Sequence, residues 1–201
     1  MKKGLAIGLG IAGFVILLIV IIFSWGIGIY NSLVTLDEQV TSSWSQVQNQ
    51  YQRRADLVPN LVNTVKGVAN FEKETYTAVT EARAKVGQMN VSPEILNNPQ
   101  MFQKFQQAQD GLSSALSRLL VAVEAYPQLK ANENFLQLQA QLEGTENRIA
   151  VERKKFNESV QNYNTRIRKF PANIIAGFAG FGQKQYFQAS EAAQEMPTVQ
   201  F

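Results

Sequence analysis

Three charged side chains occupy positions at which the surrounding pattern is apolar: Arg54, Glu72 and Glu152. Apolar residues in these stretches recur every three or four positions, as on the buried face of a helix, so each of the three falls in a core position. Polar groups in such positions can fix the order and register of packed helices. One interpretation of the pattern is therefore a buried polar layer.

A buried Arg54 needs a carboxylate partner, because an unpaired charge in a protein core is very costly. An alternative interpretation places the three charged residues at the edge of the apolar face, because Pro59 and an irregular step in the last long helix shift that face. The sequence leaves both interpretations open. The candidate partners are Glu146, Glu152 and Asp56.

Carboxylates also gather at Glu143 and Glu146, beside Asn147. Carboxylate metal sites in helical bundles, however, combine such residues with Glu-x-x-His motifs, and this chain of 201 residues has no His and no Cys. It therefore lacks a thiol nucleophile and the commonest transition-metal ligand. We predict no enzyme activity, no cofactor and no transition-metal site, and leave a weak calcium or magnesium contact open.

The charge distribution does not indicate a nucleic-acid partner. The formal net charge is +3, and two of the positive charges are Lys2 and Lys3 at the start of the chain. A nucleic-acid interface needs a concentrated basic face. The basic excess in residues 148–169 is either a solvated helix face or a surface for anionic lipid or an acidic partner.

The first part of the chain has the length and composition of a membrane anchor. Gly4 to Tyr30 is a run of 27 residues without a charge. As a helix it would be ~40 Å long, against a hydrocarbon thickness of ~30 Å. Trp25 lies near its end, where amphipathic aromatic residues favour the headgroup layer. We expect residues 1–31 to be a retained single-pass anchor in membrane lipid, since a cleaved signal peptide has an apolar region of only ~7–15 residues.

The charges on either side of this segment predict its orientation. Lys2 and Lys3 precede it, and Asp37 and Glu38 are the first charges after it. Basic flanks stay in the cytoplasm, so the N-terminus is expected inside and the following domain outside. Small residues at helical spacing in the span also favour self-association, although they are common in membrane helices in general. This stripe is formed by Gly4, Gly8 and Ala12.

Residues 32–170 have the period of helices, without the sustained alternation typical of strands. We predict an all-α fold, in which the transmembrane helix is followed by an up-and-down antiparallel bundle of about four helices. Pro59 predicts a kink or the start of a new helix, and Lys66-Gly67 is a second place where the helix can break. Residues 32–89 therefore form either one kinked rod, that is a single bent helix, or two antiparallel helices. Asn98-Pro99 reads as an N-cap and first helical position. The expected helices are residues 32–57, 59–89, 99–125 and 132–170.

The last segment, residues 171–201, is strongly apolar in its first part but contains several glycines, which weaken helices. Uncovered apolar surface of this kind is uncommon on monomers. We expect the segment to pack on its own bundle, on a neighbouring subunit or on the membrane. The residues expected to dock are Phe178, Phe181 and Phe187.

Three runs carry a family resemblance: SWSQVQNQYQRRADLVPNLV at 43–62, YPQLKANENF at 126–135 and LEGTENRIA at 142–150. With Tyr163-Asn164 and Phe170-Pro171, they closely resemble the LemA family of bacterial membrane proteins over nearly the whole chain. The resemblance implies one N-terminal helix in the bacterial cytoplasmic membrane carrying an antiparallel helical bundle. It supplies no catalytic or cofactor residues. Family members are usually predicted with the N-terminus outside the cell, which opposes the orientation indicated by the N-terminal lysines.

These features favour a non-enzymatic, membrane-anchored scaffold that self-assembles as a homo-oligomer. The alternative is an accessory or regulatory subunit of another, unidentified membrane protein, such as a protease or a transporter. The two hypotheses differ in which protein is extracted together with the chain by mild detergent. The first predicts further copies of the chain itself, and the second predicts a different protein.

Overall fold

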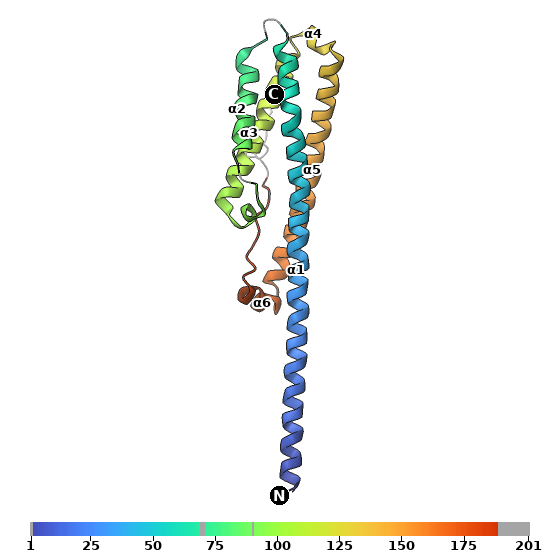
Figure 1. The fold of residues 1–201 in the computed structure, drawn as a ribbon, viewed down its shortest axis with the longest axis vertical. Helices are drawn as coiled ribbons and strands as arrows, with labels where there is room; N and C mark the ends of the chain where they lie inside the picture. Colours follow the sequence, from blue (N-terminus) through green and yellow to red (C-terminus); the bar gives the residue numbers. More distant parts are fainter. Residues whose placement is uncertain (1, 69–70, 90, 189–201) are drawn as a thin grey trace, which may run out of the picture.

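The computed structural model describes residues 2–68, 71–89 and 91–188, with side chains from residue 9 onward. Every regular element in those ranges is a helix (Figure 1), which confirms the predicted all-α class. The elements are α1 (Lys2–Lys66), α2 (Lys73–Gly87), the short 3-10 helix η1 (Pro93–Asn97), α3 (Pro99–Val123), α4 (Pro127–Lys130), α5 (Glu133–Arg168) and α6 (Ala172–Ala179).

α1 runs without a break from the expected membrane segment to the far end of the bundle, over ~100 Å. The helix boundary expected at residues 57–59 is therefore wrong, because Pro59 lies inside α1 and the chain turns only after Lys66. Proline lacks the N–H that would bond to the carbonyl of Ala55. That carbonyl instead accepts a hydrogen bond from Nε of Arg83 on α2, at 3.0 Å. The neighbouring helix thus replaces the bond that the proline removes.

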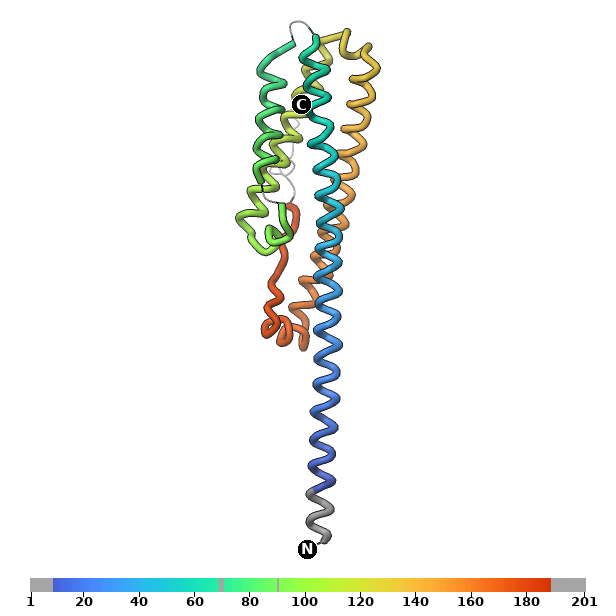
Figure 2. Tube along the Cα trace, viewed as in Figure 1, coloured from blue at the N-terminus to red at the C-terminus, as the bar shows by residue number. Residues whose placement is uncertain are grey.

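The four long helices alternate in direction, as Figures 1 and 2 show: α1 rises, α2 descends, α3 rises and α5 descends. Residues 32–89 are accordingly two antiparallel helices and not one kinked rod. The most extensive contacts are those of α1 with α5 and of α2 with α3. The antiparallel register of α1 and α5 is visible in their hydrogen bonds, since Ser43 pairs with Ser159 whereas the later Arg54 pairs with the earlier Glu146.

Local capping sets where α3 and α5 begin. The side chain of Asn98 accepts hydrogen bonds from two backbone N–H groups of α3, both at 3.1 Å, and Pro99 takes the first helical position as predicted. Asn132 caps α5 in the same way, accepting from the N–H of Phe135 at 3.0 Å. These starts follow from the local sequence alone.

The buried side chains form two apolar clusters along the bundle. The cluster nearer the membrane segment is aromatic and surrounds Trp44, whose ring centroid lies 5.3 Å from Phe105 and 5.6 Å from Phe156. The cluster at the far end is mostly aliphatic and includes Val58 and Leu112. The two clusters meet near the middle of the bundle, where the polar groups described below are placed.

Below the bundle α1 continues alone. Its large apolar side chains from Leu9 to Ile27 are exposed, and among the described helices this one is long and apolar enough to cross a membrane. Ile29 and Leu33 are the first side chains of α1 buried in the bundle. The exposed apolar length therefore ends close to residue 31, where the sequence places the end of the anchor.

Candidate functional site

Arg54 is the centre of a polar cluster between the two apolar clusters, and it is only 1% exposed. Its Nη1 donates to Ser113 Oγ at 2.6 Å and to Glu146 Oε1 at 2.9 Å. Its Nη2 donates to the backbone carbonyl of Gln109 at 3.3 Å and also to the side-chain carbonyl of that residue. The guanidinium carbon lies 5.1 Å from the ring centroid of Tyr51. One arginine of α1 thus fixes α3 and α5 at a common height.

The other two residues of the predicted polar layer lie outside this cluster. Glu72 is exposed in the turn before α2, because the helix has already broken and the apolar period no longer applies. Glu152 is 19% exposed and pairs with Lys155 of its own helix at 2.8 Å. The carboxylate that meets Arg54 is Glu146, which is one of the candidate partners and is 36% exposed.

The hydrogen bonds of the cluster hold α1, α3 and α5 together. Burial raises the pKa of Tyr51 to about 12, so its phenol stays protonated at neutral pH and cannot serve as a base. Glu143, in the proposed carboxylate group, accepts a hydrogen bond from Gln139 at 2.9 Å. Among the described residues, no group of three His, Cys, Asp or Glu side chains is arranged to hold a metal ion.

Residues 181–188, which we call the strap, run in an extended conformation along the bundle. Three helix amide side chains each bond to both the N–H and the C=O of one strap residue, as a neighbouring strand would. For Asn164 the distances to the strap are 2.9 Å to the carbonyl and 3.0 Å to the N–H. The pairs are Asn164 with Lys184, Asn157 with Phe187, and Gln106 with Gln188.

Sequence reasoning missed these amides. The available signal was the Tyr163-Asn164 pair, because both side chains fall on the buried face of α5. Tyr163 Oη donates to the carbonyl of Gly182 at 3.0 Å, so both members of the motif hold the strap. Burial raises the pKa of Tyr163 to about 12, as it does for Tyr51.

The three phenylalanines predicted to dock have different surroundings. Phe187 is buried beside Trp44, with a centroid distance of 6.0 Å and an angle of 27° between the rings. Phe181 contacts Tyr30 of α1 at 5.8 Å between centroids. Phe178, in contrast, is 91% exposed, because α6 buries only the face that turns toward the bundle. Phe178 is therefore not docked on its own bundle.

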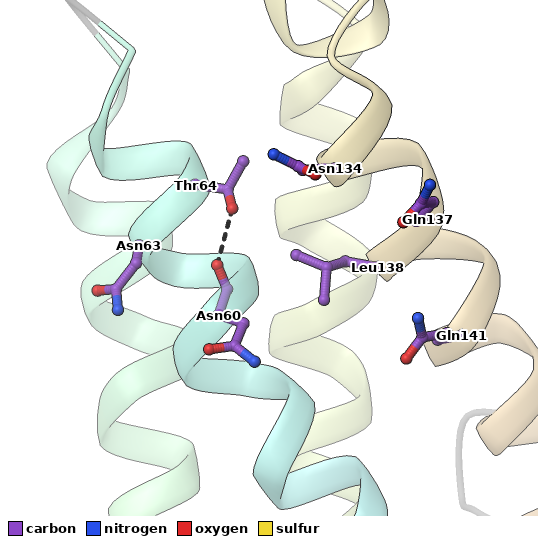
Figure 3. A pocket seen from close by; sticks show the side chains of 7 residues that line it. All are labelled: Asn60, Asn63, Thr64, Asn134, Gln137, Leu138 and Gln141. Atoms are coloured by element: carbon purple, nitrogen blue, oxygen red, sulfur yellow. Dashed lines mark hydrogen bonds between the residues drawn. The ribbon is translucent and has the colours of Figure 1, made fainter.

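A polar groove, which we call the amide groove, opens between α1 and α5 at the end of the bundle farthest from the membrane segment (Figure 3). Its volume is about 400 Å³. Its lining contains no charged side chain. Amides both donate and accept hydrogen bonds, so the groove suits a polar, uncharged surface such as that of a peptide. The lining residues are Asn60, Asn63, Thr64, Asn134, Gln137, Leu138 and Gln141.

The predicted packing stripe of the membrane helix is described only in part. Gly4 and Gly8 lie outside the residues whose side chains the structure describes, whereas Ala12 is exposed on α1. Self-association through this stripe stays a prediction.

Comparison with known proteins gives a match to the LemA family over residues 43–201. The magnetosome protein MamQ of Magnetospirillum gryphiswaldense is 28% identical over 179 residues, which cover 81% of this chain and 66% of that protein. The magnetosome protein MamQ 1 of Paramagnetospirillum magneticum gives the same values. The protein LemA of Metamycoplasma hominis is 26% identical over 181 residues, covering 89% of this chain and 77% of that protein. The chain thus spans just under two thirds of the length of the MamQ relatives.

Proposed function

The chain belongs to the LemA family, and on that premise we propose that it is a non-enzymatic, membrane-anchored scaffold that self-assembles at the bacterial cytoplasmic membrane. The observation that carries the proposal is the continuity of α1, which is both the apolar segment and the first helix of the bundle. Ile29 and Leu33 are buried in the bundle directly after that segment. The bundle is therefore held rigidly on its anchor and presents the same surface in every copy.

The apolar segment supports the self-assembly part of the proposal. Gly4, Gly8 and Ala12 recur every four residues, and helices in lipid associate through such residues because their backbones approach closely. The burial of Arg54 supports the non-enzymatic part, since its guanidinium is 1% exposed and out of reach of a substrate.

The mass of the full-length protein in mild detergent tests the proposal. Gly8→Leu should reduce the size of the oligomer, because the larger side chain separates the helices. Ser24→Leu is the matched control, since helical spacing places position 24 on the opposite side of the span. A wild-type monomer over a wide range of concentrations refutes self-assembly.

The amide groove in Figure 3 favours a second function, in which the chain is an accessory or regulatory subunit of another membrane protein. A neutral polar groove far from the anchor is suited to a peptide surface of a partner. In this case the extract contains a different chain in fixed ratio. The double change Asn63→Glu and Gln137→Glu places charges in the groove and should release that partner, while a homo-oligomer formed through the span keeps its size.

A further inference from the structure

α6 lies at the lower end of the bundle, beside the part of α1 in which the uncharged segment ends (Figure 1). Cδ1 of Ile175 is 3.9 Å from the point that a Cβ on Gly26 would occupy. The ring of Phe181, directly after α6, lies 5.8 Å from that of Tyr30. Contacts with α1 therefore fix the height of α6 along the molecule.

The same part of α1 also fixes the level of the bilayer surface. The uncharged segment from Gly4 to Tyr30 is ~40 Å long as a helix, whereas the hydrocarbon layer is ~30 Å thick. Its last turns thus lie in the headgroup layer, where Trp25 and Tyr30 are also favoured. A bilayer that surrounds α1 consequently reaches α6.

The side of α6 that turns away from the bundle is apolar and uncovered. Ala172 and Ala176 are buried, whereas Phe170 is 80%, Ile174 50% and Phe178 91% exposed. Residues 174 and 178 are one helical turn apart and so share a face. Large apolar side chains exposed on one face of a short helix and in the turn before it indicate an interaction site.

Basic side chains lie next to this apolar face. Arg166 and Arg168 lie in the last turn of α5 and Lys169 is its C-cap residue, directly before this face in the chain. Within the described part of the chain none of the three forms an ion pair. The Nε of Arg166 is buried without a hydrogen-bond partner. Asp37, at the base of the bundle, is already paired with Lys184 at 2.9 Å. The three residues form a basic rim that complements anionic lipid headgroups.

We propose that α6 is a second membrane contact, resting on the leaflet from which α1 emerges. Phe170, Ile174 and Phe178 enter the boundary between headgroups and acyl chains, and the basic rim meets the phosphates of anionic lipids. The occupant of this surface is the bilayer, because α1 holds the bilayer at this height. The proposal uses the anchor in α1 and not self-assembly, so it is unaffected if the chain proves monomeric.

Site-directed spin labelling tests the proposal on the full-length chain, which has no natural cysteine. A nitroxide is attached at Phe178→Cys and, as a matched control, at Val121→Cys, since Val121 is 73% exposed on α3. The protein is placed one copy per nanodisc, in equal parts of phosphatidylcholine and phosphatidylglycerol. Oxygen, which concentrates in lipid, should relax the label at 178 more than a water-soluble nickel complex does. At 121 the order should be reversed.

Two results overturn the proposal. If the nickel complex reaches the label at 178 as freely as the control label at 121, then position 178 lies in water. A label shielded from both reagents is covered by protein, since each disc holds a single copy. The basic rim has its own test, in which Arg166→Gln, Arg168→Gln and Lys169→Gln are combined. The label should then move outward in the anionic discs to its depth in pure phosphatidylcholine, and an unchanged depth refutes the role of the rim.

Discussion

Replacing Arg54 by leucine tests whether the buried polar cluster holds the bundle together. Breaking a fully buried ion pair costs ~3–5 kcal/mol, mostly because one charge stays buried alone. Here Glu146 is 36% exposed and can recover water, which lowers the cost. The side chain of Gln109 is buried and loses its donor, at ~1–3 kcal/mol. We therefore expect Arg54→Leu to lower the free energy of unfolding by about 3 kcal/mol, at the low end of that range.

Urea unfolding of the full-length chain in mild detergent measures this loss through Trp44, which lies in the aromatic cluster of the bundle. Trp25→Phe is included in every variant so that only Trp44 emits. Arg53→Leu is the matched control, because the neighbouring arginine is exposed and should change stability by less than about 0.5 kcal/mol. A loss below about 1 kcal/mol for Arg54→Leu, the value of an exposed pair, refutes the reasoning.

Four further predictions concern the buried phenols, the strap and the orientation. Tyr51→Phe should leave stability unchanged or raise it by up to ~1 kcal/mol, because the hydroxyl is buried without a partner, whereas Tyr163→Phe should lower it by ~1 kcal/mol through loss of its bond to the strap. Both phenols have a pKa raised from 10.0 to about 12, so the unfolded chain releases these protons first and stability should fall between pH 10 and 12, and it should fall less in the double phenylalanine variant. Asn164→Leu should speed tryptic cleavage within the strap, and exposed Asn162→Leu should not. A reporter fused after Phe201 should be active only outside the cytoplasm, and cytoplasmic activity would reverse the proposed orientation.

Structural features that depend only on residues adjacent in the chain were predictable from the sequence. The helical period and the Asn98-Pro99 cap are of this kind, and both are present as expected. The course of the chain at Pro59 was not predictable, because Arg83 of another helix bonds the carbonyl that the proline leaves free. Periodicity also placed Glu72 in a core position, although a turn precedes it.

The candidate sites also divide into features that the local sequence indicates and features that depend on distant parts of the chain. Arg54 stands out in the sequence as a charge in an apolar position, and Glu146 was among its possible partners. The amides that hold the strap were missed, because asparagine on a helix usually indicates a solvated face and the strap residue lies elsewhere in the chain. Asn164 forms its hydrogen bond with a residue 20 positions later in the chain, and no local sequence pattern predicts a contact over that separation.

Because α1 is unbroken, a tilt of its apolar segment tilts the whole bundle. About 36 residues of α1 lie between Tyr30 and Lys66, a rise of ~54 Å. Transmembrane helices tilt by ~20° on average, and they adjust that tilt to the thickness of the bilayer. A tilt of this size displaces the amide groove sideways by ~18 Å relative to an upright helix. For an α1 that spans the bilayer, we therefore expect a change in bilayer thickness to move the distal end of the bundle without rearrangement inside it.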